Sequence, residues 1–132
     1  MSEMLPQGAT IGILGGGQLG RMSALAASRL GMRTHIYCPE ENCPASHVTD
    51  LFTCASYEDI SKLKEFATNV DVISYEFENI PLEAIEVLSG TKPVYPDANL
   101  LMVSQNRLKE KSFLNQSGIK TAPWSPATSA AD

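Results

Sequence analysis

The sequence is short of the features that mark membrane, secreted and nucleic-acid-binding proteins. None of its apolar runs approaches the roughly 18 residues that a membrane-spanning helix requires, and its start, MSEMLPQGATIGIL, lacks the basic residues and long apolar stretch of a signal peptide. Its three cysteines form no Cys-x-x-Cys pair, which argues against a disulfide framework and a metal site. The net charge of -5 argues against nucleic acid as a partner. We therefore expect a cytoplasmic protein with reduced thiols.

What is present is typical of one ordinary globular domain. The chain has 132 residues, of which 43% are hydrophobic, and its mean hydropathy is -0.09. This length is enough for a real core but short for a multi-step enzyme.

Short apolar runs alternate with amphipathic stretches along the chain. Five runs are typical of buried strands: 10–14, 34–38, 51–55, 70–76 and 92–96. Four stretches have helical spacing of apolar residues: 19–30, a segment opened by a capping-box pattern at 56–59, 81–88, and 97 to about 118. This alternation predicts an α/β fold, a Rossmann-like, doubly wound and mostly parallel sheet of about five strands.

The stretch LGGGQLGRM, residues 14–22, joins the first predicted strand to the first predicted helix. It contains the spacing Gly15-x-Gly17-x-x-Gly20. Glycines let backbone N–H groups approach an anion closely, and the start of the helix adds its positive dipole end. The loop is therefore interpreted as an anion site, with a tight turn that binds nothing as the alternative.

A dinucleotide needs a further residue that this sequence does not supply. A nicotinamide-dependent Rossmann domain places Asp or Glu at the end of its second strand, where the carboxylate binds the ribose hydroxyls. Here that strand ends at Cys38, and Glu40 and Glu41 follow only in the loop beyond. The loop therefore favours a phosphate or sugar phosphate. An NAD(P)-binding oxidoreductase domain remains the alternative function.

Polar residues also follow the fourth predicted strand, in SYEFENI. The carboxyl ends of parallel strands form the ligand-binding edge of such sheets, so this segment, the glycine loop and the loop 38–46 are expected at one rim. Glu76 is nearest the strand and could accept a hydrogen bond from a ligand hydroxyl or amine, whereas Glu78 is equally consistent with solvated surface. His35 and His47 are interpreted as structural.

Five motifs together resemble one family: IGILGGGQLGRM, CPASHV, DVISYEFENI, QNRLKEKSFL and GIKTAPW. Their order and spacing, over about Thr10–Trp124, are similar to those of the 5-(carboxyamino)imidazole ribonucleotide synthases, the ATPase subunits of phosphoribosylaminoimidazole carboxylase. The resemblance implies an ATP-grasp ligase of purine biosynthesis. Enzymes of this family join 5-aminoimidazole ribonucleotide to bicarbonate, so the resemblance also implies ATP and magnesium as cofactors.

The resemblance also implies roles for individual residues. Arg107 matches an arginine that contacts ATP, although Asn106 stands where the family usually has Asp. Cys38 replaces an acid common at the end of the second strand. The ribonucleotide-facing residues implied by the resemblance are Gly15, Gly16, Gly17, Gln18, Leu19 and Glu76.

The family's members are roughly two to three times this length, and their nucleotide lysine, magnesium carboxylates and most catalytic groups lie in later domains. We therefore expect residues 1–118 to be the Rossmann-like N-terminal domain and 119–132 to be a linker or the start of an ATP-grasp domain. The resemblance places no catalytic residue and no metal ligand within this chain. The last helix would normally pack on those later domains. Without them its apolar surface is exposed, so we also expect self-association.

Overall fold

The centre of the fold is a five-stranded sheet in which every neighbouring pair is parallel. The protein is described here by a computed structural model that places residues 4–127 and 129. The strands are β1 (Thr10–Leu14), β2 (Arg33–Cys38), β3 (Leu51–Cys54), β4 (Val72–Tyr75) and β5 (Val94–Tyr95). Their order is β3-β2-β1-β4-β5, with β1 in the middle. The predicted α/β, doubly wound sheet is confirmed.

The register of the sheet brings three chain segments to one edge. Leu14, the last residue of β1, is level with Tyr37 of β2 and Tyr75 of β4. Because the three strands are parallel, the residues that follow each of them leave the sheet on the same side. The glycine loop therefore lies between the segment after β2 and the segment after β4.

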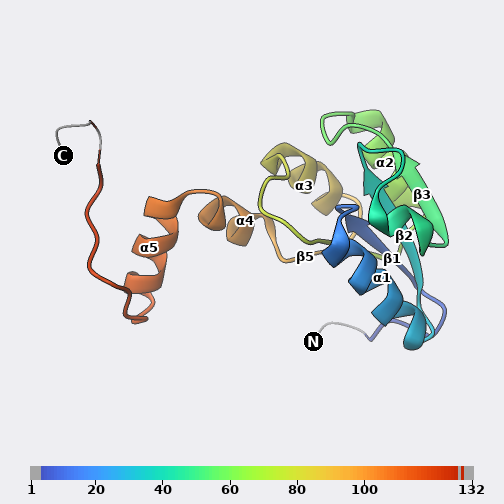
Figure 1. The fold of residues 1–132 in the computed structure, drawn as a ribbon, viewed down its shortest axis with the longest axis horizontal. Coiled ribbons are helices and arrows are strands. Elements are labelled where there is room, and N and C mark those ends of the chain that lie inside the picture. Colours follow the sequence, from blue (N-terminus) through green and yellow to red (C-terminus); the bar gives the residue numbers. More distant parts are fainter. Residues whose placement is uncertain (1–3, 128, 130–132) are drawn as a thin grey trace.

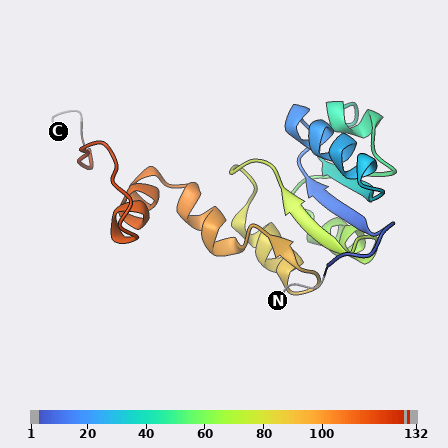
Figure 2. The ribbon, with the colours of Figure 1, turned by 90° about the horizontal axis from the view of Figure 1, so that it is seen from below.

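Helices cover both faces of the sheet, as Figures 1 and 2 show. One face carries α1 (Gln18–Arg29) and the short 3-10 helix η1 (Pro44–His47), and the other carries α2 (Ile60–Thr68) and α3 (Leu82–Ser89). The larger hydrophobic cluster fills the second face. It needs a glycine in β1, because a Cβ on Gly12 would lie 2.6 Å from Cζ of Phe66 in α2.

Two predicted helix boundaries are wrong. The expected capping box at 56–59 does not form, because Asp59 itself caps α2 by accepting a hydrogen bond from Lys62 N at 3.0 Å. The Ser56 hydroxyl instead accepts one from Glu58 N. The predicted helix from 97 to about 118 is divided into α4 (Ala98–Ser104) and α5 (Arg107–Gln116).

The division between α4 and α5 has a local cause. Asn106 has extended backbone angles, and its side-chain oxygen accepts hydrogen bonds from Leu108 N and Lys109 N at 3.0 and 3.1 Å. This is the geometry of an N-cap, which opens a new helix rather than continuing the old one. Both views show α4 and α5 extending away from the sheet, and α5 has no buried residue.

None of the helices in the described part of the chain combines the length and apolar character needed to cross a membrane.

Candidate functional site

The glycine loop makes a tight turn from β1 into α1 that only glycine can make. Gly15 has φ +120°, a region that other residues rarely adopt. A Cβ on Gly20 would lie 2.4 Å from the carbonyl oxygen of Gly15, so the first turn of α1 packs directly on the loop backbone. Two of the three motif glycines are thus explained by backbone geometry alone.

The start of α1 is suited to an anion. Its N-cap, Gly17, has no side chain to cap the helix, and the first turn contains no acidic residue. Among the residues that the structure describes, the N–H groups at this helix end have no hydrogen-bond partner, and they carry the positive end of the helix dipole. Gln18 and Leu19 are exposed on this turn.

Glu76 lies against the same loop. It follows β4 directly, and its backbone N–H donates to the carbonyl oxygen of Leu14. A Cβ on Gly15 would lie 2.6 Å from Cγ of Glu76, and one on Gly17 would lie 3.3 Å from Oε1. The sheet register thus fixes a carboxylate beside the helix start, where it can accept hydrogen bonds from a bound ligand.

These groups share a small hollow of about 210 Å³ at the carboxyl edge of the sheet. Three predicted segments meet there, which confirms the expected rim. The residues that line it are Gly16, Gly17, Cys38, Pro39, Glu40, Tyr57, Glu76 and Phe77.

The interpretation from sequence missed Tyr57, which follows β3, and Phe77. Their ring centroids are 6.0 Å apart, so they give the hollow an aromatic wall. The only feature of the sequence that could have predicted a role for Tyr57 is its place just after the third apolar run. Burial, with smaller contributions from Cys38 and Glu76, raises the pKa of the Tyr57 hydroxyl well above its ordinary value, so this hydroxyl remains protonated and can donate.

Cys38 stands where a dinucleotide-binding domain has a carboxylate. Its burial raises the pKa of the thiol to about 11, so the group is uncharged at neutral pH. A Cβ on Gly16 would lie 2.3 Å from Sγ of Cys43 and 2.6 Å from Sγ of Cys38. The two buried thiols therefore pack against the glycine loop. This position offers no carboxylate to bind the hydroxyls of a ribose.

Arg107 is not part of this hollow. It is the first residue of α5, its side chain is 77% exposed, and one of its terminal nitrogens forms an ion pair with Glu110 at 2.5 Å. Figure 1 shows α5 well away from the glycine loop. The structure therefore separates the residue expected at ATP from those expected at the ribonucleotide.

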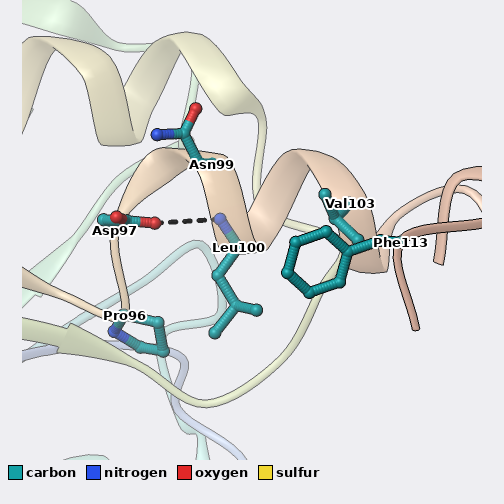
Figure 3. A pocket seen from close by; sticks show the side chains of 6 residues that line it. All are labelled: Pro96, Asp97, Asn99, Leu100, Val103 and Phe113. Carbon is teal, nitrogen blue, oxygen red and sulfur yellow. Dashed lines mark hydrogen bonds between the residues drawn. The ribbon is translucent and has the colours of Figure 1, made fainter. Parts of the chain in front are cut away.

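A larger hollow, of about 440 Å³, lies between α4 and α5. Figure 3 shows that Leu100, Val103 and Phe113 supply apolar surface to it, while the carboxylate of Asp97 is engaged with Leu100 N. Its lining lacks the converging polar groups that fix a small polar ligand. In the described part of the chain, no group of three or more His, Cys, Asp or Glu residues is placed to hold a metal ion.

The fold and this glycine-rich edge are those of the domain that precedes the ATP-grasp domains of ribonucleotide synthetases. The family profile of the ribonucleotide synthetase preATP-grasp domain matches residues 8–105, and the chain belongs to this family.

Individual relatives agree. The N5-carboxyaminoimidazole ribonucleotide synthase of Brucella melitensis is 52% identical over 91% of this chain. An ADP complex of N5-carboxyaminoimidazole ribonucleotide synthetase superposes with a TM-score of 0.89 at 38% identity, covering 93% of this chain and 33% of that one. The Aspergillus clavatus synthase, solved with ADP and 5-aminoimidazole ribonucleotide, superposes with a TM-score of 0.79 at 28% identity, covering 89% of this chain and 31% of that one.

This chain spans 33% of the length of the Brucella relative. The relatives named above are all N5-carboxyaminoimidazole ribonucleotide synthases, and they give no support to the alternative of a nicotinamide-dependent oxidoreductase.

Proposed function

We propose that this chain is the ribonucleotide-binding part of an ATP-dependent ligase that carboxylates 5-aminoimidazole ribonucleotide with bicarbonate in purine biosynthesis. The observation that carries the proposal is the hollow in which the start of α1 and Glu76 face each other, in a chain 52% identical to such a synthase. A helix start suits the phosphate, and the carboxylate suits a hydroxyl or amine.

The roles of the residues follow from this geometry. Gly15, Gly16, Gly17, Gln18 and Leu19 would face the phosphate. The N–H groups of the last four would receive it, because the N–H of Gly15 already donates to the carbonyl oxygen of Tyr37 at 3.0 Å. Glu76 would accept a hydrogen bond from the sugar or the amine. Arg107, which is exposed on α5, would contact ATP from this domain's side.

The remaining proposals concern the whole enzyme. Residues 1–118 would form the N-terminal domain, and 119–132 a linker or the start of the ATP-grasp part. ATP and magnesium would be held largely by that part, which would also supply the catalytic groups and take the bicarbonate. The enzyme would act in the cytoplasm, and the exposed apolar surface of α4 and α5 would allow self-association.

The proposal is tested by adding ligands to the 132-residue chain and following its amide signals by NMR. We expect 5-aminoimidazole ribonucleotide to shift the signals of residues 15–19 and 76, weakly and saturably. Two variants, Gly17→Val and Glu76→Gln, should weaken these shifts, because the first fills the loop and the second removes a negative charge. Glu58→Gln, an exposed acid outside the lining of the hollow, serves as the matched control.

NADH is the competing ligand, and its fluorescence reports binding directly. Saturable NADH binding without any response to the ribonucleotide would refute the proposal in favour of a dinucleotide-binding domain. The chain alone should also show no ribonucleotide-dependent ATP hydrolysis, because the proposal places the catalytic groups elsewhere in the enzyme.

A further inference from the structure

The side chain of Gln105 ties together two parts of the chain that are remote in sequence. Gln105 ends α4, and its Nε2 donates to the carbonyl oxygen of Glu78 at 2.8 Å and to that of Ile80 at 2.7 Å. A side-chain amide nitrogen has two hydrogens, and here both are used. The two acceptors lie in the segment that joins β4 to α3.

That segment carries one wall of the hollow. It begins with Glu76 and Phe77, which line the hollow opposite the glycine loop, and it ends at Ile80, which is fully buried in the larger core cluster. Among the described residues, the other long-range hydrogen bond of this segment runs from Glu76 N to Leu14 O and is long, at 3.4 Å. The two bonds from Gln105 are therefore its principal polar restraint.

On its other side, Gln105 adjoins the start of α5. The next residue, Asn106, caps that helix, and Arg107 is the first residue in it. The backbone of Gln105 is itself fixed, because its N–H donates to the carbonyl oxygen of the buried Leu101 at 3.0 Å. One side chain thus connects the segment that presents Glu76 to the junction that presents Arg107.

We propose that Gln105 is a positioning residue that holds the ribonucleotide subsite and the ATP contact at a fixed separation. This inference rests on the proposed function for the identity of the two ligands. Without the two hydrogen bonds, the segment 76–80 and the α4–α5 junction would move independently. Each ligand would then have to order its own subsite on binding.

The kinetic test uses a chimera in which this chain replaces the matched segment of the Brucella melitensis synthase. Gln105→Ala removes the side chain, and Gln105→Glu keeps its shape but replaces the donor nitrogen with an acceptor. We expect both variants to raise the KM for the ribonucleotide about tenfold, from the loss of two hydrogen bonds. The KM for ATP should rise as well, with a smaller change in kcat. Gln116→Ala, on the exposed end of α5, should leave all three constants unchanged.

A second measurement does not depend on activity. In the 132-residue chain, Gln105→Ala and Gln105→Glu should increase the fast backbone motion of residues 77–80, measured by NMR as lower heteronuclear NOE values, while β1 stays unchanged. Unchanged NOE values at 77–80 would overturn the inference, as would increased motion with both KM values unaltered. An unsubstituted chimera that is inactive would count against the proposed function instead, and the NOE result would still decide the role of Gln105.

Discussion

Gly15 and Glu76 are in direct contact across the edge of the sheet. A Cβ on Gly15 would lie 2.6 Å from Cγ of Glu76 and 2.8 Å from its Oε1. The contact follows from the register. Leu14 and Tyr75 are the last residues of two paired parallel strands, β1 and β4, so the residues that follow them leave the sheet side by side. The turn that forms the anion site is therefore built against the carboxylate that faces it.

This contact predicts that Gly15→Ala destabilises the protein in two ways at once. The new methyl group would meet Glu76, and alanine would be strained at φ +120°. We expect the free energy of unfolding to fall by about 2–4 kcal/mol, the sum of backbone strain and steric displacement. Denaturant unfolding measures the loss.

Gly118→Ala is the matched control, because Gly118 also has positive φ, at +79°, but none of the described residues has an atom within 4 Å of its added Cβ. It should lose only the strain of a side chain at positive φ, about 1–2 kcal/mol. Equal losses in the two variants would show that the contact with Glu76 contributes nothing.

The sequence was sufficient to predict the sheet and its ligand edge, but not the details that depend on tertiary contacts. The alternation of strands and helices predicts a mostly parallel sheet, and hence that the glycine loop and the segment containing Glu76 meet at its carboxyl edge. The division of the last helix was not predicted, because apolar residues continue past Asn106 and only its capping geometry separates the two helices. The aromatic wall of Tyr57 and Phe77 depends on how β3 and β4 are spaced in the sheet, which no local pattern encodes.

His35 predicts a loss of stability in mild acid. The ring is buried, Nε2 is hydrogen-bonded to the Thr53 hydroxyl at 2.8 Å, and Nδ1 has no partner within the described part of the chain. Burial lowers the pKa of His35 below 6.5 in the folded state. As the pH falls below 6.5, the unfolded chain therefore binds a proton that the folded chain does not, and the free energy of unfolding decreases.

Denaturant unfolding between about pH 7.5 and 5.5 tests this, because carboxylates titrate mainly below that range. His35→Gln should flatten the slope. The exposed His47 gives a matched variant, His47→Gln, which should retain it. A slope that survives in His35→Gln would assign the acid sensitivity to other groups.

The three thiols are predicted to differ sharply in reactivity. Cys54 is exposed, whereas Cys38 and Cys43 are 5% and 1% exposed. Burial also raises the pKa of the Cys38 thiol, which removes the reactive thiolate at neutral pH. A thiol reagent such as dithionitrobenzoate should therefore titrate one cysteine rapidly in the native protein and all three in denaturant. Cys54→Ser should abolish the rapid phase, and a rapid phase that persists would mean that the glycine loop opens readily.

Self-association through α4 and α5 is predicted from their exposed apolar side chains. Leu100 of α4 and Phe113 of α5 are each about half exposed and line the hollow between the helices, and Ile119, which follows α5, is also about half exposed. Clustered apolar surface of this kind favours association. Light scattering should show a mass that rises with concentration, and Phe113→Ser should reduce the rise. Leu30→Ser, at an exposed position beyond α1, is the control. A constant monomer mass at high concentration would contradict the prediction.

The separation of Arg107 from the glycine loop predicts opposite kinetic effects at the two places. A guanidinium group offers several fixed donors to a phosphate or a nucleotide edge, and a charge-assisted hydrogen bond contributes about 1.5–3 kcal/mol. In the chimera with the Brucella melitensis synthase, Arg107→Ala should therefore raise the KM for ATP about ten- to a hundredfold. The KM for the ribonucleotide should change much less. Lys109→Ala, which removes a charge two residues further along α5, should change neither constant.

Gly17→Val should do the reverse, because its side chain would lie against Glu76 and crowd the helix start where the phosphate is expected. The KM for the ribonucleotide should then rise far more than that for ATP. The two variants act at separate places, so their effects on the free energy of binding should add. If Arg107→Ala instead raises the KM for the ribonucleotide and spares that for ATP, then Arg107 serves the ribonucleotide subsite and its assignment to ATP is wrong.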